Sequence, residues 1–386
     1  MSTSPQTPAT IVFIGLGWFP HSPGGNERYV YELTRQLAKR GDRIELCGVD
    51  LPNEQPDNAL ILTNLCQSHW PLPKRLRETR RQFLQRSSQT PDAINLHFPL
   101  YGLPLLSVLP PHIPVTLTFH GPWAAESQQE GANWFSVALK RWVERRVYHE
   151  MDRFIVLSHA FGTILHRDYG IPWDQIRVIP GGVDIERFAP KYNQQEARQV
   201  LGWPRDRWTL FTPRRLVPRM GLEILIQAVA QLKPHYPALS LAIAGKGPLQ
   251  RSLEQQITDL QLSDSVHLLG FMPDEDLPTA YQAADLTLIP SQALEGFGLV
   301  LLESLACGTP VVCTPVGGMP EVLQPFSPQL ITAGTSIQAL AQTLQQILDQ
   351  KLPLPTGADC RAHICAHYDW SGVAERVRQV LLEDIH

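Results

Sequence analysis

The sequence lacks any cysteine spacing that is typical of a zinc site. Its six cysteines form no C-x-x-C pair, and Cys307 and Cys313 lie within apolar runs. A zinc-bound framework is therefore not expected. We interpret Cys307 and Cys313 as small buried residues of a hydrophobic core.

Long hydrophobic runs are also missing. No stretch approaches the roughly 18 apolar residues that a membrane-spanning helix needs. The opening segment MSTSPQTPAT has no basic side chain, and the apolar run at 11–16 is too short for the core of a signal peptide. These absences predict a cytoplasmic protein.

An excess of positive charge is absent as well. The chain has 33 Lys and Arg against 37 Asp and Glu, which gives a formal net charge of −4. Sequence-independent binding to a nucleic-acid duplex needs a basic excess, so we expect no nucleic-acid partner. Charged residues make up only 18% of the chain and apolar residues 43%. This composition indicates a well-packed chain with little disorder.

The chain is long enough for two hydrophobic cores. Its 386 residues favour two domains of under 200 residues each. In both halves, short apolar runs rich in Val and Ile alternate with segments of helical periodicity. This alternation predicts parallel sheets with helices on both faces, and hence two Rossmann-like α/β domains. Ligands of such domains bind at the carboxyl ends of the strands.

The expected elements follow from the same alternation. In the first half we expect strands at 10–16, 43–49, 93–96, 115–120 and 153–157, and helices at 27–40, 74–86 and 135–150. In the second half we expect strands at 209–212, 240–244, 266–269, 286–289 and 310–314, and helices near 222–232, 249–260, 277–284 and 299–307.

The segment IPGGVDIERFAP at 179–190 reads as the domain boundary, because glycine and proline cluster there. We predict an N-terminal domain at 1–183 and a C-terminal domain at 184–368. The remaining residues, 369–386, have helical periodicity and are expected to cross back to the N-terminal domain.

One segment carries the strongest functional signal. It reads Glu295-Gly-Phe-Gly-Leu299, follows an expected strand and opens a helix that contains Glu303. Gly296 and Gly298 let the backbone approach a ligand closely, and the free N–H groups at the helix start favour phosphate. We expect Glu303 to accept two hydrogen bonds from a ribose diol and Glu295 to meet a sugar.

This segment, EGFGLVLLESLACGTPVV with its E-x7-E spacing, resembles the signature of the family 4 retaining glycosyltransferases. Further resemblances extend over nearly the whole chain. They are Pro23-Gly-Gly-Asn-Glu27, Val178-Ile-Pro180, Gly182-Val-Asp184, Arg215-Leu-Val-Pro218, Gly245-Lys-Gly-Pro248 and Tyr368-Asp-Trp370. Gly181 departs from the pattern, since the family usually has asparagine there.

The resemblance implies a GT-B fold, in which two Rossmann-like domains face each other across a cleft. It implies a retaining hexosyltransferase that moves a sugar from a UDP-, GDP- or ADP-sugar donor to a hydroxyl acceptor, without a metal or another cofactor. The residues it marks as catalytic are His120, Arg215 and Glu295. Those it marks as donor-binding are Gly24, Gly25, Gly245, Gly247, Phe271, Gly296, Phe297, Gly298, Leu299 and Glu303. We add Arg219, which stands beside the position where the family has a lysine.

Several of these residues also have simpler interpretations. Gly24 and Gly25 are also typical of an ordinary turn before a helix. His120 closes the run VTLTFHG, and a lone histidine is more often structural than a ligand. The resemblance favours a contact between His120 and the donor sugar.

The sequence departs from the family pattern at Met220, where a phosphate-binding lysine is usual. Arg215 offers a planar fork suited to a diphosphate. Either Arg219 or Arg214 supplies the second cation, or one arginine and backbone amides hold the phosphates. A solvated basic turn is the simpler interpretation of Arg214 and Arg219.

Two charged segments suggest further sites. Asp274-Glu275-Asp276 has the D-x-D form of a metal motif, but it precedes a helix, so we interpret it as capping. Basic clusters lie at 74–86 and 140–153. The first has an apolar stripe of Leu76, Phe83 and Leu84 that would suit peripheral membrane docking, although a solvated helix face is the simpler explanation.

Two rival functions remain open. A nucleotide-sugar epimerase shares the architecture but would not use the E-x7-E signature, and a catalytically silent sugar-nucleotide-binding subunit would tolerate Met220. For a transferase, stabilisation of the leaving diphosphate by Arg215 and a helix start would replace a metal ion. The acceptor would be recognised by loops at 50–72 and 121–134.

Overall fold

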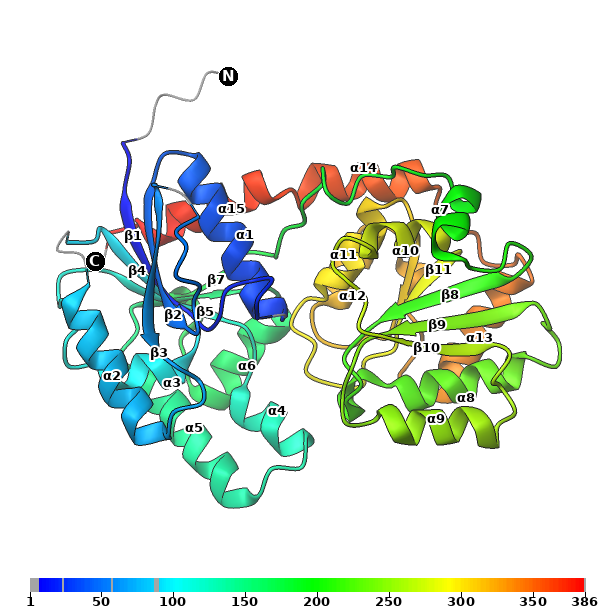
Figure 1. Cartoon of the computed structure of the whole chain (residues 1–386), viewed down its shortest axis with the longest axis horizontal. Coiled ribbons are helices and arrows are strands. Elements are labelled where there is room, and N and C mark those ends of the chain that lie inside the picture. Colours follow the sequence, from blue (N-terminus) through cyan, green and yellow to red (C-terminus); the bar gives the residue numbers. More distant parts are fainter. Residues whose placement is uncertain (1–6, 23, 57, 87–89, 385–386) are drawn as a thin grey trace. The chain divides into compact units, whose positions relative to one another are not determined.

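The computed structural model describes residues 7–22, 24–56, 58–86 and 90–384, which form two compact units (Figure 1). Unit 1 comprises residues 1–128, 132–181 and 370–386, and unit 2 comprises residues 129–131 and 182–369. Each unit is built on its own parallel sheet, as the alternation of apolar runs and helical segments predicts.

Unit 1 contains a seven-stranded parallel sheet in the order β3-β2-β1-β4-β5-β6-β7. The chain runs outward from β1 in one direction through β2 and β3, and then restarts at β4 on the other side of β1. This reversal is a topological switch point at the carboxyl ends of β1 and β4, the position where sheets of this kind bind their ligands. The strands are β1 (Thr10–Ile14), β2 (Arg43–Val49), β3 (Leu60–Cys66), β4 (Ala93–Leu96), β5 (Val115–Phe119), β6 (Arg153–Val156) and β7 (Ile176–Val178).

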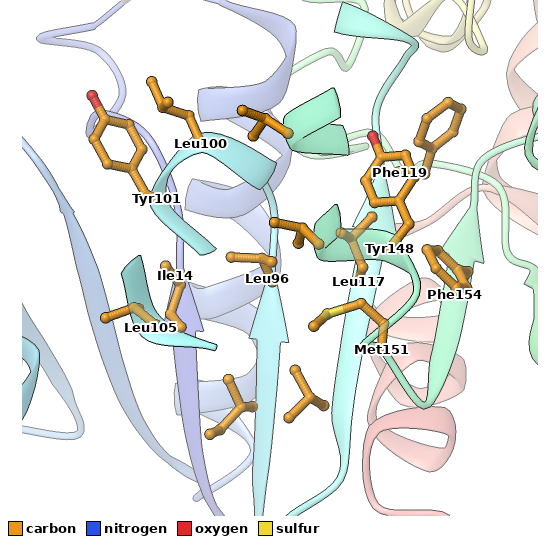
Figure 2. Close-up of a cluster of buried hydrophobic side chains, with 14 of the residues drawn as sticks. Ile14, Leu96, Leu100, Tyr101, Leu105, Leu117, Phe119, Tyr148, Met151 and Phe154 are labelled. Carbon is orange, nitrogen blue, oxygen red and sulfur yellow. The ribbon is translucent and has the colours of Figure 1, made fainter. Parts of the chain in front are cut away.

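Helices cover both faces of this sheet. On one face, α1 and α15 pack against each other; on the other, α3 packs against α5. Figure 2 shows Leu96 and Leu117 of the sheet meeting Leu100, Tyr101 and Tyr148 of these helices in a buried core. The helices are α1 (Gly25–Lys39), α2 (Leu72–Gln85), α3 (Pro99–Gly102), α4 (Trp123–Gln129), α5 (Trp134–Tyr148), α6 (His159–Tyr169) and α15 (Trp370–Leu381).

The closing helix α15 belongs to unit 1 although the rest of its chain neighbourhood belongs to unit 2. Arg378 forms two buried hydrogen bonds to Asp42, at 2.7 and 2.9 Å, and Asp42 also accepts one from the Ala9 N–H. Trp370 is buried against the ring of Tyr29 on α1. These contacts fix α15 by charge and by packing together.

Unit 2 contains a five-stranded parallel sheet in the order β10-β9-β8-β11-β12. The same reversal occurs between β8 and β11, so unit 2 has a topological switch point of the same kind at their carboxyl ends. The strands are β8 (Trp208–Pro213), β9 (Leu239–Ala244), β10 (Val266–Gly270), β11 (Leu286–Ile289) and β12 (Val311–Cys313).

Seven longer helices flank the unit 2 sheet. The helices α8, α9 and α13 lie over one face, and α7, α10, α11 and α14 lie over the other (Figure 1). Their bounds are α7 (Gln194–Leu201), α8 (Leu222–Leu232), α9 (Gln250–Asp259), α10 (Leu277–Ala283), α11 (Leu299–Ala306), α13 (Ile337–Leu348) and α14 (Gly357–His367), with the short α12 (Met319–Leu323) after β12.

Every expected strand and helix is present within a few residues of its expected bounds, but others were missed. The missed strands are β3 and the short edge strand β7, and the missed longer helices are α6, α7, α13 and α14. The expectation of plain loops at 50–72 and 121–134 is wrong, because β3 and α4 lie within them. In the described part of the chain, no helix has the length and hydropathy to cross a membrane.

The expected apolar stripe on the basic helix α2 does not face solvent. Phe83 is buried in the core of unit 1, and Leu76 packs against that core; only Leu84 is exposed. The cations are also engaged: Arg75 donates to the Tyr101 hydroxyl, and Arg81 pairs with Glu78 at 2.6 Å. The membrane-docking hypothesis for 74–86 therefore loses its apolar component.

Candidate functional site

The switch point of unit 2 brings together segments that lie about 80 residues apart in the sequence. β8 ends at Pro213 and leads directly to Arg214, while β11 ends at Ile289 and leads through Pro290 to Ser291. Because β8 and β11 are neighbours in a parallel sheet, both segments leave the sheet at the same edge.

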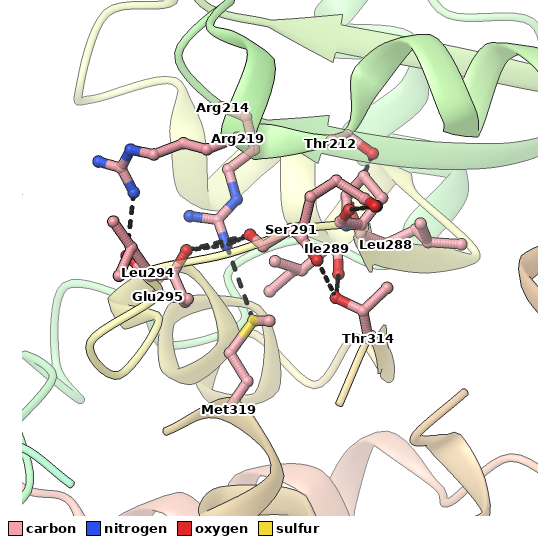
Figure 3. A network of polar contacts seen from close by, with 12 residues as sticks. Thr212, Arg214, Arg219, Leu288, Ile289, Ser291, Leu294, Glu295, Thr314 and Met319 are labelled. Atoms are coloured by element: carbon pink, nitrogen blue, oxygen red, sulfur yellow. Dashed lines mark hydrogen bonds and ion pairs between the residues drawn. The ribbon is translucent and has the colours of Figure 1, made fainter. Parts of the chain in front are cut away.

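A buried polar network joins these two segments (Figure 3). The Arg214 guanidinium lies 3.0 Å from the Glu295 carboxylate and donates to the Ser291 hydroxyl at 3.3 Å. The Ser291 hydroxyl donates in turn to Glu295 at 3.1 Å, and Thr314 donates to the Ser291 carbonyl at 2.6 Å. Glu295 is therefore held in place by side chains from two strands.

The loop that carries Glu295 also packs closely against other backbone. A Cβ atom on Gly317 would lie 1.6 Å from the Glu295 carbonyl oxygen, and Gly317 has a φ of +59°. The N–H of Gly318 donates to that same oxygen at 3.1 Å. Only glycine allows this approach, so the segment at Gly317 and Gly318 holds the backbone of the Glu295 loop in place.

The start of α11 has no side-chain cap. Gly298 occupies the N-cap position with a left-handed φ of 83°, and no side chain accepts a hydrogen bond from the first turn. An uncapped helix start presents N–H groups and the positive end of the helix dipole to an anion. The predicted helix start at Leu299 is therefore present, and phosphate binding there remains a prediction.

Glu303 lies on α11 about one turn from this helix start and is buried. Its Oε2 accepts a hydrogen bond from the Tyr281 hydroxyl at 2.8 Å. Tyr281, on α10, is itself fully buried. The carboxylate is thus oriented by a neighbouring helix, which is how a rigid hydrogen-bonding group for a ligand is built.

The three arginines after β8 occupy different environments. Arg215 has a side chain that is 59% exposed. Arg219 is largely buried, and its guanidinium donates to the Leu294 carbonyl at 3.1 Å, next to Glu295. Met220 is buried. Arg214 is already committed to Glu295, so Arg215 and Arg219 are the better placed pair for a diphosphate.

Gly245 and Gly247 form a turn beneath this segment. A Cβ atom on Gly245 would lie 1.9 Å from the Arg214 carbonyl oxygen, and one on Gly247 would lie 2.3 Å from the Leu216 carbonyl oxygen. These glycines are thus required for backbone packing, whether or not they touch a ligand. Phe271 follows Gly270, whose carbonyl accepts a hydrogen bond from the Gly245 N–H at 2.7 Å; Phe271 is 56% exposed, and the Lys246 ammonium is 5.5 Å from the centre of its ring.

In unit 1, His120 follows β5 and meets a second histidine that follows β4. His97 Nδ1 and His120 Nε2 are 2.9 Å apart, and the two rings stack with centroids 5.2 Å apart. The Tyr29 ring packs edge-on against His120. Burial lowers the pKa of His120 to about 3. Burial and then the neighbouring His120 lower the pKa of His97 well below its ordinary value. Both imidazoles are therefore neutral at physiological pH, and one donates to the other.

The predicted glycine loop after β1 is partly helical. Gly24 is the N-cap of α1 and Gly25 is its first residue, and Gly24 itself has no side chain with which to cap the helix. Pro23 lies outside the described residues. A Cβ atom on Gly24 would lie 2.1 Å from a Glu27 carboxylate oxygen. Glycine at this position therefore lets the Glu27 carboxylate fold back against the backbone of the helix start.

The capping interpretation of 274–276 is wrong in its detail. Asp276 is the N-cap residue of α10, but its side chain makes no capping hydrogen bond. The Asp274 carboxylate instead pairs with Arg187, whose guanidinium also donates to the Asp274 carbonyl at 2.7 Å. Within the described residues, no three His, Cys, Asp or Glu side chains gather in a way that would bind a metal ion.

Sequence reasoning missed four residues that orient the candidate site: His97, Tyr281, Ser291 and the pairing role of Arg214. Three of them act through a partner far away in the sequence, 22 residues for Tyr281 and Glu303, 23 for His97 and His120 and 81 for Arg214 and Glu295, whereas Ser291 donates to Glu295 four residues on. The position of His97 directly after a buried strand was the one available signal, since strand ends in parallel sheets meet at one edge.

Two family sequence models match the chain on either side of the unit boundary. The model described as "Glycosyltransferase Family 4" matches residues 23–187, and the model described as "Glycosyl transferases group 1" matches residues 193–363. Together they cover the sheet of unit 2, every strand of the unit 1 sheet except β1, and the candidate site residues.

Curated relatives are similar over part or all of the chain. A GDP-mannose-dependent monoacylated alpha-(1-6)-phosphatidylinositol monomannoside mannosyltransferase of Corynebacterium glutamicum is 32% identical over 212 residues, which is 53% of this chain. The match spans 55% of that relative's own length. A D-inositol 3-phosphate glycosyltransferase of Mycolicibacterium smegmatis is 28% identical over 96% of this chain and 90% of its own.

Solved structures share the fold. Sucrose-phosphate synthase from Thermosynechococcus elongatus superposes with a TM-score of 0.81 at 24% identity, over 96% of this chain and 98% of its own. Anabaena HepE in complex with UDP-glucose gives a TM-score of 0.76 at 21% identity, over 97% and 99%. At these identities the likeness establishes the GT-B fold.

Proposed function

Because this chain belongs to the Glycosyl transferases group 1 and Glycosyltransferase Family 4 families, we propose that it transfers a hexosyl group from a nucleotide-diphosphate sugar to a hydroxyl acceptor. The proposed reaction retains the anomeric configuration and uses no metal ion. Unit 2 is the proposed donor domain and unit 1 the proposed acceptor domain.

One observation carries this proposal. The uncapped start of α11 and the oriented carboxylate of Glu303 lie one helical turn apart on the same helix. A helix start suits a phosphate, and a fixed carboxylate suits the two hydroxyls of a ribose. Their separation along α11 matches a nucleoside diphosphate, in which ribose and phosphates are directly joined.

The chemistry requires charge stabilisation rather than a protein nucleophile. Breaking the anomeric bond places positive charge on the sugar and negative charge on the departing diphosphate. Arg215, Arg219 and the N–H groups at the start of α11 are proposed to stabilise that negative charge. This arrangement makes a metal ion unnecessary. Same-face attack by the acceptor, with the leaving phosphate taking its proton, is what the family resemblance implies.

The remaining predicted residues have supporting roles in the proposal. A neutral His120 donates or accepts a hydrogen bond at the donor sugar, with His97 fixing its ring. Glu295, held by Arg214 and Ser291, is proposed to contact the sugar hydroxyls. Phe271 and the turn at Gly245 and Gly247 are proposed to border the nucleotide, and Gly24 and Gly25 its phosphates.

The names of the relatives suggest which substrates to try first. One is GDP-mannose-dependent, and another is named for D-inositol 3-phosphate. HepE was solved with UDP-glucose. We therefore propose a UDP-, GDP- or ADP-hexose as donor and a polyol, glycan or lipid-linked hydroxyl as acceptor. A cytoplasmic location is part of the proposal, because that compartment supplies nucleotide sugars.

Thermal stabilisation by nucleotides tests the donor site directly. A ligand that binds only the folded chain stabilises it by about 2.7 kcal/mol at 100 times its Kd. UDP, GDP and ADP, and then their hexose conjugates, should each be measured with the wild type and with Glu303→Ala. One base should raise the melting temperature in the wild type alone. Absence of any shift from all three bases would overturn the proposed donor site.

Met220 favours a second candidate, a catalytically silent sugar-nucleotide-binding subunit. The usual phosphate-binding cation is replaced there by a buried thioether. Such a subunit would show the thermal shift but neither hydrolyse nor transfer the donor sugar. An epimerase would instead change the sugar while leaving the nucleotide attached, which chromatography of the donor distinguishes from transfer.

A further inference from the structure

The helix α5 of unit 1 has an outward face that packing within the chain does not explain. Trp134, Phe135 and Trp142 are 79%, 66% and 55% exposed, and Leu139 is exposed beside them. These are large apolar side chains on a single helix of fifteen residues. Scattered exposed apolar residues are ordinary, but a contiguous set marks an interaction surface.

The inward face of α5 packs against unit 1 without any contribution from these exposed side chains. Val137, Val143 and Val147 are buried, and the buried Glu144 accepts a hydrogen bond from Tyr169 at 2.9 Å. The Asn133 side chain caps the helix by accepting from the Ser136 N–H at 2.9 Å. The helix is therefore fixed in place, and its aromatic side chains are held outward by the fold.

Cations share this outward face with the aromatic side chains. Arg141, Arg145 and Arg146 are exposed. They lie on the same arc of the helix as Trp134 and Trp142, because residues three, four, seven and eleven apart point in similar directions. Glu144 is the single carboxylate within 134–149, and it is buried. Just beyond the end of the helix, the exposed Glu150 pairs with Arg146, so Arg141 and Arg145 carry the positive charge of this apolar face.

A groove of about 790 Å³ runs along this face. Its walls include Trp134, Ala138, Arg141, Trp142, Arg145 and His149. Aromatic rings and guanidinium groups thus line one continuous depression that lies wholly within unit 1.

We propose that the outward face of α5 docks on the surface of an anionic phospholipid bilayer. Tryptophan and phenylalanine favour the boundary between headgroups and acyl chains, and arginines beside them attract acidic headgroups. The positive charge that lies between these tryptophans is complementary to a surface of uniformly negative headgroups. This α5 surface takes the place of the membrane-docking surface that the sequence suggested on α2, where Phe83 and Leu76 pack into the core. It lies in unit 1, whereas the proposed nucleotide-binding residues of α11 lie in unit 2.

The test compares two lipid compositions and three variants. The purified chain is sedimented with vesicles of phosphatidylcholine alone and of phosphatidylcholine mixed with phosphatidylglycerol. One variant removes the aromatic rings, Trp134→Ser with Phe135→Ser and Trp142→Ser, and a second removes charge, Arg141→Gln with Arg145→Gln. The matched control, Leu72→Ser with Leu84→Ser, changes two exposed apolar side chains on α2. Melting temperatures confirm that each variant folds.

The wild type and the α2 control should sediment with the phosphatidylglycerol vesicles, and less so as salt is raised. The arginine variant should partition about 25-fold more weakly, since each cation near an anionic surface contributes about fivefold. The aromatic variant should lose binding to the phosphatidylglycerol vesicles, together with any weaker binding that the wild type shows to phosphatidylcholine alone.

Three results would overturn the proposal. The wild type fails to bind phosphatidylglycerol vesicles; the α2 control loses binding while the α5 variants keep it; or the wild type is a dimer that the aromatic variant separates while vesicles bind neither. The last result would identify the α5 face as a contact between two copies of this chain.

Discussion

At the scale of single residues, the structure separates the arginines that sequence reasoning left open. Arg219 donates to the Leu294 carbonyl in the loop that precedes α11, whereas Arg214 pairs with Glu295 inside the fold. Replacing Arg219 should mainly lower the transfer rate, whereas replacing Arg214 should mainly lower the stability of the fold. Arg219 is therefore the stronger candidate for the cation that Met220 does not provide.

We expect Arg219→Ala to lower the transfer rate on the order of 10²-fold, as for a lost donor to developing negative charge, with little change in stability. Arg214→Ala should instead cost about 3–5 kcal/mol of stability, because the Glu295 carboxylate is left buried without its partner. Steady-state kinetics and urea unfolding of both variants check this. A stable Arg214→Ala chain with a crippled rate, beside a normal Arg219→Ala, would reverse the assignment.

Glu303 and Tyr281 provide a second residue-scale prediction. Glu303→Ala should weaken binding of the nucleoside diphosphate by about 1–3 kcal/mol, the range for charge-assisted hydrogen bonds. Tyr281→Phe should have a smaller effect on the same affinity, because it frees the carboxylate without removing it. Calorimetric titration measures both. Equal affinity of Glu303→Ala and the wild type would show that Glu303 does not bind the ribose.

At the scale of elements, the buried pair between α15 and the turn before β2 should dominate the attachment of the closing helix. Arg378→Ala leaves Asp42 buried and unpaired, so we expect a loss of about 3–5 kcal/mol in the free energy of unfolding. The control is Arg40→Ala, which breaks a more exposed pair with Glu375 between α1 and α15. Exposed pairs contribute under about 1 kcal/mol. Similar losses in both variants would contradict the account.

Glu144 on α5 should make the stability of the fold depend on pH. Burial raises the pKa of Glu144 from 4.5 to about 7, opposed by hydrogen bonds from Tyr169 and the α4 backbone and by the charge of Arg141. Between these two pH values the folded chain binds more protons than the unfolded chain, so this group lowers stability as pH rises.

Glu144→Gln removes that penalty. Its stability relative to the wild type should therefore increase by about 3 kcal/mol from pH 4.5 to pH 7, taking 1.36 kcal/mol for each unit of pKa. Urea unfolding at several pH values measures the difference. Glu150→Gln, which changes an exposed carboxylate paired with Arg146, is the control and should show no such slope. A flat difference for Glu144→Gln would mean that its carboxylate is solvated.

At the scale of the whole molecule, the alternation of apolar and helical segments predicted both sheets. Strands such as β1 and β12 are nearly continuous apolar runs that are buried on both faces, and burial of this kind leaves a strong signal in the sequence. The edge strand β3 contains Thr63 and Asn64 and is covered on fewer sides, so its signal is weaker. The helix α14 was missed because its side chains show little apolar periodicity; Arg361 anchors it through the Ala306 carbonyl instead.

The candidate site likewise has features that were predictable from the sequence and features that were not. The glycines and carboxylates of the loop before α11 are local in sequence, and their spacing indicated the helix start. The pairings of Arg214 with Glu295 and of His97 with His120 depend on which strands are neighbours. Strand order follows from the three-dimensional fold, so no local pattern in the sequence contains these contacts.

The central claim is that the whole chain transfers a hexosyl group with the diphosphate stabilised by protein groups alone. It is tested most directly by incubating the chain with labelled UDP-, GDP- and ADP-hexoses in EDTA and following release of the nucleoside diphosphate together with movement of the label. We predict that one donor is turned over at the same rate with and without EDTA, and that Arg219→Ala and Glu303→Ala reduce this rate. Loss of turnover in EDTA that magnesium or manganese restores, or no turnover of any donor, would contradict the account.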